Sequence, residues 1–359
     1  MMRILIVSHP PLRAEFGAAQ TALTLASALR DRGHDAVAWS PEPLPLGTRW
    51  WNIWQRQTRN IERFIGSHGP FDVIDTPAIS ASRRLNRYGR LVVRSIQPEL
   101  RYLLFELRND LLGQPSLRSL AHAALRFPRA AAILAGWRRA SRILCLGSYE
   151  LYWMRRFFPR WVSKLRFYIS SPPPNERLAL REVRRLRQSG PEGEGIRFLW
   201  IGRWTEHKGI RRLVSWIMER AATSPSDTVT LAGCGSMATQ DLSPEWLRSG
   251  RVRLVPSFSR AELPALLASH NAGLFTSTVE GWGLNLNEML ESGMPVFATE
   301  TGGVADLRPF FPESLRLFPP PIRLEPWPPL EDLEVNGYFA HFDWAAIAKS
   351  YEEDILEVP

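Results

Sequence analysis

Two carboxylates with a fixed spacing are the residues most suggestive of chemistry in this chain. Glu280 and Glu288 lie on either side of a glycine turn, with seven residues between them, in the segment STVEGWGLNLNEMLESGMPVFATETGG. Carboxylates at such positions can accept hydrogen bonds from hydroxyl groups, as a sugar or a ribose offers. The alternative, which short motifs always leave open, is a strand–helix turn with two solvated acids.

The turn between the two acids is suited to an anion. Gly281 and Gly283 permit tight backbone geometry that a side chain resists. A helix that begins near Asn285 or Leu286 directs its free N–H groups and its positive dipole end at the turn. A phosphate is the natural occupant of that position.

Two further loops of the second half could join this site. The segment GRWTEHKG begins at Gly202 and contains Arg203 and Lys208, whose permanent charges suit a diphosphate. The segment AGCGS contains Gly233 and Gly235. Taken alone, the two cations would more often be surface charges. Together with the glycine turn they describe a nucleotide-sugar site.

These loops follow apolar runs that read as strands. In the second half, strands alternate with helices, which implies a parallel sheet with the loops along one edge. The strands are expected at 198–201, 228–232, 252–255, 272–276 and 295–298, with helices after the first of them and over 260–269.

The first half also opens as a strand–helix–strand unit. A strand over 4–7 precedes a helix ending near Arg32 and a strand over 36–39. The loop between the first strand and the helix lies where open α/β sheets bind ligands. It contains one glycine, Gly17, and is therefore no dinucleotide fingerprint. Further strands are expected at 71–75, 91–94 and 142–146, with a helix over 116–140 that is interrupted at Pro128.

Composition sets the domain organisation. The 359 residues are sufficient for two domains. We expect a first domain over 1–170, joined by a C-terminal helix over 343–359, a proline-, glycine- and charge-rich linker region over 171–195, and a second domain over 196–342. Two distant cysteines, no signal-peptide core and no apolar run of membrane length predict a cytoplasmic protein.

The net charge of +9 is unevenly distributed, because residues 83–166 carry 18 basic and four acidic residues. The stretch 149–161, YELYWMRRFFPRW, mixes aromatic rings with arginines. This mixture suits an anionic membrane surface and predicts peripheral contact at the inner face of the membrane. The alternative, which we favour for most of these rings, is an amphipathic helix that packs on the sheet.

Three separated motifs resemble glycosyltransferase family 4 (glycosyl transferases group 1), which has a G-R-x4-K-G loop, an E-x-[FW]-G-x4-E turn and a P-V-x-A-T-x-x-G-G strand and turn. The matching residues are Gly202, Arg203, Lys208 and Gly209, then Glu280, Trp282, Gly283 and Glu288, then Pro295, Val296, Ala298, Thr299, Gly302 and Gly303. The resemblance covers about 197–308. It implies an α/β GT-B fold, with two Rossmann-like domains whose parallel sheets face across a cleft and a C-terminal helix that packs on the first domain.

The resemblance also implies roles. Arg203 and Lys208 resemble the cations that neutralise the donor diphosphate, and Glu280 resembles the acid that holds the donor sugar. Glu288 resembles the acid that binds the ribose. The remaining donor-binding positions are Gly202, Gly233, Gly235, Gly281, Trp282, Gly283, Leu284 and Asn285. No metal and no other cofactor is expected, since the two cations take the place of Mg²⁺.

The implied activity is transfer of a sugar, with retention, from a UDP-, GDP- or ADP-linked donor to a glycan or lipid-linked acceptor, as in polysaccharide biosynthesis. The first half departs from the family pattern, because Ile96 or Gln97 stands where many relatives carry a histidine, and the glycine-rich loop is thinned to Gly17. The alternative is therefore a weak or inactive nucleotide-sugar-binding protein of the same fold. First-domain cleft residues are expected among His9, Gly17, Arg94 and Gln97.

Two other function classes fit poorly. An NAD-type oxidoreductase would need G-x-G-x-x-G after a first strand, and the chain has none. A nucleic-acid partner is suggested by charge alone, without a binding module, so no nucleic acid is expected.

Overall fold

The computed structural model describes residues 1–359 except 14, 50–51, 113–116, 188–194, 323–328 and 357–359. The chain divides into two compact units. The first unit contains Met1–Ser171 and His341–Pro359, and the second contains Pro172–Ala340. Most of the expected glycine-rich boundary at 190–195 lies outside the described residues. The earlier part of the expected linker region forms helix α6 (Pro174–Leu186) of the second unit.

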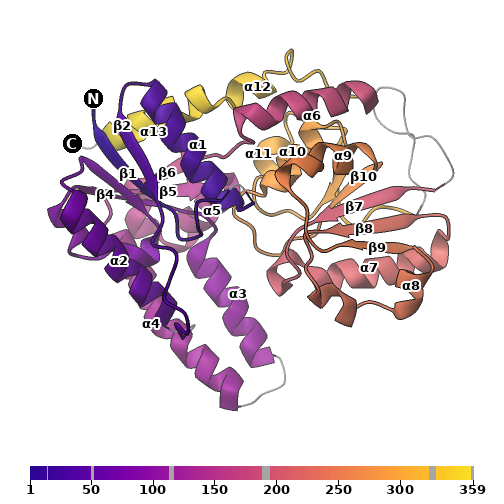
Figure 1. Ribbon diagram of the computed structural model, residues 1–359, viewed down its shortest axis with the longest axis horizontal. Coiled ribbons are helices and arrows are strands. Elements are labelled where there is room, and N and C mark those ends of the chain that lie inside the picture. The colour runs from indigo at the N-terminus through magenta and orange to yellow at the C-terminus, as the bar shows by residue number, and fades with distance from the viewer. Residues whose placement is uncertain (14, 50–51, 113–116, 188–194, 323–328, 357–359) are drawn as a thin grey trace. The chain divides into compact units, whose positions relative to one another are not determined.

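The first unit is built on a six-stranded parallel sheet with the order β2-β1-β3-β4-β5-β6. Its four central strands are buried along almost their whole length because helices cover both faces of the sheet (Figure 1). The strands are β1 (Arg3–Val7), β2 (Asp35–Trp39), β3 (Val73–Thr76), β4 (Arg90–Arg94), β5 (Arg142–Leu146) and β6 (Leu165–Tyr168).

The helices of the first unit include a long hairpin of α3 and α4, which lie side by side and extend away from the sheet (Figure 1). The expected interruption at Pro128 is wrong, because α4 continues through it. Burial of Ile133 and Trp137 in the core offsets the cost of a proline inside a helix. The helices are α1 (Gly17–Asp31), α2 (Ile53–His68), α3 (Glu99–Leu112), α4 (Leu117–Arg139), α5 (Gly147–Phe157) and α13 (Trp344–Leu356).

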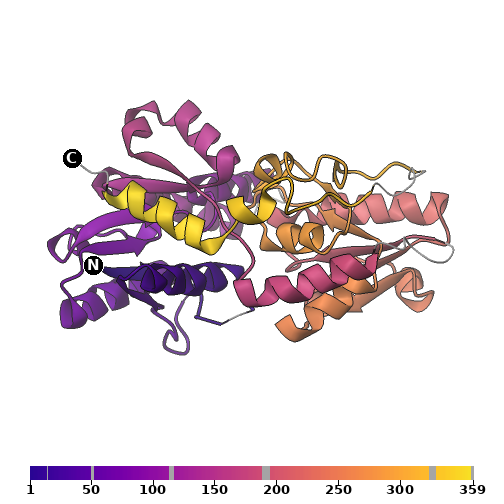
Figure 2. The same ribbon diagram turned by 90° about the horizontal axis from the view of Figure 1, so that it is seen from above.

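The C-terminal helix α13 packs on the first unit beside α1, as predicted (Figure 2). Its apolar stripe is buried because Ile347, Tyr351 and Ile355 recur with helical spacing. The Tyr351 hydroxyl donates a hydrogen bond of 3.0 Å to Asp75 on β3. Asp75 also accepts from Arg94 Nε at 2.9 Å, so a buried ion pair anchors the helix to the sheet.

The second unit contains another six-stranded parallel sheet, with the order β12-β11-β10-β7-β8-β9. The strands are β7 (Arg197–Ile201), β8 (Thr228–Ala232), β9 (Val252–Val255), β10 (Ala272–Phe275), β11 (Val296–Ala298) and β12 (Leu315–Leu317). The helices are α6, α7 (Ile210–Thr223), α8 (Pro244–Arg248), α9 (Leu263–Ala268), α10 (Leu284–Glu291), α11 (Val304–Leu307) and α12 (Tyr338–His341).

Each sheet has a point at which the strand order reverses. In the first sheet it lies between β1 and β3, and in the second between β7 and β10. Loops that leave the carboxyl ends of such strand pairs diverge and create a crevice, which is where open α/β sheets bind ligands. In both units the topology therefore fixes where a site is expected.

The aromatic stretch 149–161 mostly packs inward, as we favoured. Trp161 is buried, and its ring stacks on Phe158 at a centroid distance of 5.4 Å. Tyr152 and Phe157 are the exceptions, with 72% and 59% of their surface exposed. No helix in the described part of the chain is both long and apolar enough to span a bilayer.

Candidate functional site

The second unit brings two predicted site residues into direct contact. Lys208, from the loop after β7, donates a hydrogen bond from Nζ to Oε2 of Glu280, from the loop after β10, at 2.5 Å. The two loops meet because β7 and β10 are neighbouring parallel strands. Both side chains are about 15% exposed. The pair therefore sits at the reversal point of the sheet, partly open to solvent.

The environment of Glu280 keeps its carboxyl group ionised. Burial opposes ionisation, but the Lys208 charge and hydrogen bond outweigh it and lower the pKa of Glu280. The Ser277 hydroxyl adds a hydrogen bond of 2.9 Å to the same oxygen. Neighbouring His207 is buried, and burial together with the Lys208 charge lowers its pKa to about 4. At neutral pH the site thus presents an acceptor carboxylate beside a neutral imidazole.

The lysine at this position is unusual for the chain, which contains 45 basic residues but lysine only at positions 164, 208 and 349. Arginine serves nearly everywhere else. An ammonium is a compact point charge with three donors, whereas a guanidinium is a planar fork. The rarity of lysine thus marks Lys208 in the sequence, although our prediction of the site did not use it.

Two glycines allow the loops to approach each other. Gly209 has φ +73°, and a Cβ there would lie 1.9 Å from the carbonyl oxygen of Thr276. Gly283 has φ +88°, and a Cβ there would lie 2.7 Å from the ring of Phe275. Both positions combine a left-handed backbone with a close contact, so only glycine fits them.

Helix α10 begins at Leu284, directly after Gly283 and one residue earlier than expected. The Asn285 side chain donates a hydrogen bond of 2.8 Å to the carbonyl oxygen of Ile201, at the end of β7. Leu284 and Asn285 are half-buried. The helix N-terminus is thus fixed at the same sheet edge as the Lys208–Glu280 pair, which is the geometry predicted for a phosphate-binding turn.

Trp282 is placed differently from a ligand-contacting ring. Its side chain is 3% exposed, and its indole N–H donates a hydrogen bond of 2.5 Å to Asn287 Oδ1. It packs so closely on Gly303 that a Cβ there would lie 2.9 Å from the indole. The Trp282 ring therefore packs the turn, and Gly281 beside it is also buried. Donor binding at these two positions stays a prediction.

Glu288 is buried in an ion-pair network within the second unit. Its carboxylate, 2% exposed, accepts a hydrogen bond of 2.6 Å from Arg260 Nη2. Arg260 also binds Glu176 of α6. Burial raises the pKa of Glu288, and the Arg260 charge opposes this effect. Sequence reasoning missed Arg260, since nothing in the spacing of 28 residues links it to Glu288.

The remaining second-unit positions lie along the same sheet edge. Arg203 is exposed in the loop after β7. Gly202 donates its N–H to the carbonyl oxygen of Ala232 at 2.9 Å, which ties the ends of β7 and β8 together. Gly233 and Gly235 follow β8 with φ values of +71° and +67°.

A separate hollow of about 620 Å³ in the second unit lies against α7 and the loops after β10 and β11. It is lined by Ser277, Thr278 and residues 298–301 of the segment 277–303, but by none of the residues predicted to be catalytic or donor-binding. Sequence reasoning gave no indication of it.

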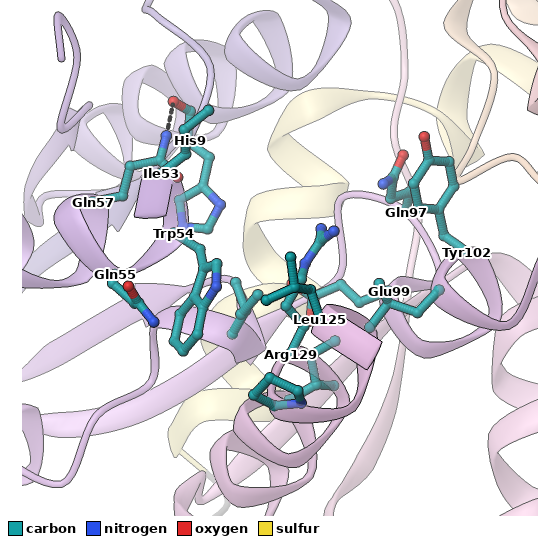
Figure 3. A pocket seen from close by; sticks show the side chains of 14 residues that line it. His9, Ile53, Trp54, Gln55, Gln57, Gln97, Glu99, Tyr102, Leu125 and Arg129 are labelled. Carbon is teal, nitrogen blue, oxygen red and sulfur yellow. Dashed lines mark hydrogen bonds between the residues drawn. The ribbon is translucent and has the colours of Figure 1, made fainter. Parts of the chain in front are cut away.

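The first unit has its own pocket of about 400 Å³, at the reversal point between β1 and β3 (Figure 3). His9 and Gln97, both predicted, line it. His9 Nε2 and Ser80 Oγ share a hydrogen bond of 2.8 Å. Burial lowers the pKa of His9 to about 4, so this imidazole is neutral.

An acid that sequence reasoning missed lies in the same pocket. Glu99 begins α3 just after β4, and its Oε2 accepts the N–H of Ala78 at 3.1 Å. Burial, with a contribution from Glu150, raises the pKa of Glu99 to about 8. Its position two residues after Gln97 at a strand end was the available signal, but burial of the carboxyl group depends on elements distant in sequence.

The other two predicted first-domain residues are absent from this pocket lining. Arg94 is 2% exposed and is held in the Asp75 ion pair. Gly17 is exposed at the start of α1. Across the described residues of both units, no group of three or more His, Cys, Asp or Glu side chains is arranged to hold a metal ion. Independence from metal stays a prediction.

Residues 195–309, about a third of the chain, match the family model described as Glycosyl transferases group 1. Among solved structures, the whole chain is similar to sucrose-phosphate synthase from Thermosynechococcus elongatus, with a TM-score of 0.65, 16% identity and coverage of 100% of this chain and 95% of that one. The fold is GT-B. This similarity and the two parallel sheets confirm the predicted two-domain, Rossmann-like architecture.

Two other structures of similar fold contain nucleotides. Starch synthase IV from Arabidopsis thaliana, bound to ADP and acarbose, aligns with a TM-score of 0.61 and 11% identity over 99% of each chain. HepE of Anabaena, in complex with UDP and glucose, aligns with a TM-score of 0.52 and 16% identity over 99% of this chain and 94% of that one. Such distant similarity shows the fold alone.

Two curated relatives match part of the chain in sequence. Glycogen synthase of Mycobacterium tuberculosis is 30% identical over 112 residues, which are 30% of this chain and 27% of that protein. The uncharacterized glycosyltransferase YqgM of Bacillus subtilis is 27% identical over 119 residues, which are 32% of this chain and 33% of that protein. The match thus spans about a third or less of each of these relatives.

Proposed function

We propose that the protein is a glycosyltransferase that moves a sugar from a nucleotide-sugar donor to a glycan or lipid-linked acceptor. The observation that carries this proposal is the Lys208–Glu280 contact at the reversal point of the second sheet. Both residues lie in the stretch that matches Glycosyl transferases group 1. That match, and the named glycosyltransferases above, do not favour the non-catalytic alternative.

The donor is proposed to be a sugar linked to UDP, GDP or ADP. Support for a nucleotide comes from two structures of similar fold, one in complex with UDP and glucose and one bound to ADP and acarbose. Support from this chain comes from the N-terminus of α10, the exposed Arg203 and the ammonium of Lys208, which suit a diphosphate.

In the proposed reaction, the bond between the sugar C1 and the diphosphate oxygen breaks, and the nucleoside diphosphate leaves with the electron pair. The acceptor oxygen forms a new bond to C1 and passes its proton to the departing phosphate. Arg203 and Lys208 stabilise the charge that develops on that phosphate. An ammonium has three donors, so Lys208 can bind a phosphate oxygen while it still holds Glu280. Glu280 then accepts hydrogen bonds from the sugar hydroxyls.

Retention of configuration, family 4 membership and independence from metal ions are part of the proposal and rest on the motif resemblance. A cytoplasmic protein in peripheral contact with the membrane is also proposed. The exposed Tyr152 and Phe157 on α5, with exposed Arg155 and Arg156 beside them, support contact with an anionic surface. Flotation with phosphatidylserine vesicles, but not with phosphatidylcholine vesicles, is expected at low salt. Absence of flotation would exclude this contact.

The activity is tested on purified full-length protein. UDP-, GDP- and ADP-glucose are first compared for protection against thermal unfolding, and release of nucleoside diphosphate is then measured with the protective donor. Lys208→Met and Glu280→Gln are each expected to lower turnover by about 100-fold or more, because each removes a charge from the reacting centre.

Lys349→Met is the matched control, since that lysine is 64% exposed and distant in sequence. It is expected to turn over like the wild type. Far-ultraviolet circular dichroism establishes that each variant is folded. Wild-type turnover in folded Lys208→Met and Glu280→Gln would contradict the assigned roles, and failure of all three nucleotide sugars to protect or react would contradict the donor site itself.

A further inference from the structure

The side chains that line the first-unit pocket indicate which kind of ligand it can bind. Its apolar surface comes from Ile53, Ile79, Leu103, Leu125, Pro128 and Ile133. Two aromatic rings, Trp54 of α2 and Tyr102 of α3, stand on opposite sides, and Arg129 of α4 lies between them (Figure 3). Apolar surface and rings beside a few polar groups are typical of a small-molecule site, and a volume of about 400 Å³ is within the usual range.

The charge on this wall is positive at neutral pH. Burial keeps His9 neutral and keeps Glu99 protonated, as described above. The glutamine amides of the lining are uncharged. Within the described lining, Arg129 is therefore the side chain that carries a charge at pH 7. A pocket whose lining carries one positive charge and otherwise neutral side chains favours an anion over a neutral or cationic ligand.

Arg129 also has unused hydrogen-bonding capacity. Its Nε is buried and has no hydrogen-bond partner among the described residues. Its Nη1 lies 3.9 Å from Glu106, at the limit of an ion pair, and Glu106 is held more closely by Arg126. A buried N–H without a partner destabilises the folded protein, and a bound oxyanion would supply the missing hydrogen bond. A guanidinium binds carboxylate or phosphate through two parallel hydrogen bonds.

From this geometry we propose that the first-unit pocket binds an acidic acceptor, a sugar or polyol that carries a phosphate or carboxylate group, and that Arg129 recognises this group. The inference rests on the proposed function, in which the first unit supplies the acceptor site. The rings of Trp54 and Tyr102 would cover the apolar faces of the acceptor. The carboxyl group of Glu99 and the amide of Gln97 would contact its hydroxyls. A neutral glycan would leave the buried Nε of Arg129 without a partner.

The test compares acidic and neutral probes by isothermal titration calorimetry on the full chain. The probes are glucose 6-phosphate, glucuronate, dihexanoyl phosphatidic acid below its micellar concentration, and glucose as the uncharged reference. At least one acidic probe is expected to bind at least tenfold more tightly than glucose. A preference for glucose 6-phosphate or glucuronate indicates a free acceptor, and a preference for the lipid indicates a lipid-linked one.

Substitutions of Arg129 test whether the acidic probe binds in the first-unit pocket. Arg129→Gln is expected to weaken the acidic probe at least tenfold, and Arg129→Lys to weaken it less, since it keeps the charge. Arg138→Gln, an exposed arginine on the same helix, is the matched control and is expected to bind within twofold of the wild type. Equal binding of acidic and neutral probes, no binding of any acidic probe, or full binding by folded Arg129→Gln would overturn the inference.

A nucleotide titration in parallel separates this inference from the proposed function. UDP, GDP and ADP report on the second unit, and Arg203→Gln is expected to weaken them but not the acidic probe. Nucleotide binding without acidic-probe binding would overturn the pocket inference alone. Acidic-probe binding that depends on Arg129, without nucleotide binding or turnover, would overturn the proposed function alone. Acidic-probe binding that depends on Arg203 instead of Arg129 would place the anion in the second unit and overturn the pocket assignment.

Discussion

Replacing Glu99 with glutamine is expected to make the protein more stable at alkaline pH. Glutamine has the shape of the protonated carboxyl group and can still accept the N–H of Ala78. It cannot ionise, so the variant never has to bury the negative charge that burial disfavours in the wild type. The effect is therefore expected to grow with pH instead of being constant.

The sign and size follow from the two pKa values of Glu99. Below its ordinary value of 4.5, the group is protonated in both the folded and the unfolded chain and contributes nothing. Between 4.5 and about 8, the unfolded chain releases the proton and the folded chain keeps it, so stability falls as pH rises. Above that window the loss is constant. This pKa shift can lower the free energy of unfolding of the wild type by at most about 5 kcal/mol. Because the carboxyl group faces a pocket open to water, we expect roughly half of it.

The assay is urea unfolding followed by tryptophan fluorescence from pH 5 to pH 9, and the measured quantity is the difference between Glu99→Gln and wild type. This difference cancels the groups that titrate independently of Glu99. Glu150, whose charge raises the pKa of Glu99, does not cancel completely. Glu150, with its pKa raised to about 7, acts in the same direction, and His9, with its pKa lowered to about 4, acts in the opposite direction below pH 6.5. The charge of Arg129, which lowers the pKa of Glu99, is also common to both proteins.

Glu353→Gln, a change at a 60% exposed carboxylate of the same unit, is the control and is expected to give a flat difference. Carbonyl NMR of the labelled glutamates provides a direct check, since the signal absent from Glu99→Gln should titrate near pH 8. A stability difference that stays constant from pH 5 to pH 9, or a Glu99 midpoint near 4.5, would refute the reasoning.

Two further predictions concern the second unit. Gly283→Ala is expected to destabilise the protein by about 1–3 kcal/mol, because a Cβ at φ +88° is strained and meets an aromatic ring; an unchanged urea midpoint would contradict this. Glu288→Gln is expected to cost about 3 kcal/mol, because Arg260 loses a buried carboxylate partner, and to weaken nucleotide binding if the carboxylate reaches the ribose. Calorimetry with UDP, GDP and ADP on the folded variant separates the two effects.

The alternation of strands and helices was predictable because parallel strands buried on both faces are short apolar runs between turn residues. Strands β5, β8 and β9 were predicted with their observed bounds, and the stripe of α13 matches its buried face. Helices α2 and α3 were both missed, since α2 has only three buried positions and α3 only two. Such helices form through packing against the unit more than through their own periodicity.

The candidate site in the second unit was predictable for the same local reason. Its residues lie in short loops directly after strands, so strand order alone brings Lys208 to Glu280. Contacts between side chains of elements that are distant in sequence could not be predicted from the sequence pattern. Arg260 reaches Glu288 across 28 residues, and the pocket around Glu99 is closed in part by α2, which follows a different strand, β2. Burial of a carboxyl group is a property of the assembled unit and cannot be read from its neighbours in sequence.

The two reversal points show how one topology produces opposite chemistry. In the second sheet, Lys208 lies 2.5 Å from Glu280, and its charge outweighs burial, so the acid is held as a carboxylate that accepts hydrogen bonds. In the first sheet, burial outweighs the opposing charge of Arg129, so Glu99 keeps a proton that it can donate. An acceptor carboxylate suits the hydroxyls of a donor sugar, whereas a neutral acid beside an arginine tolerates an anion. The balance between burial and the charge of an opposing cation thus separates two kinds of ligand within one fold, and a cation placed against Glu99 is the change that would ionise it.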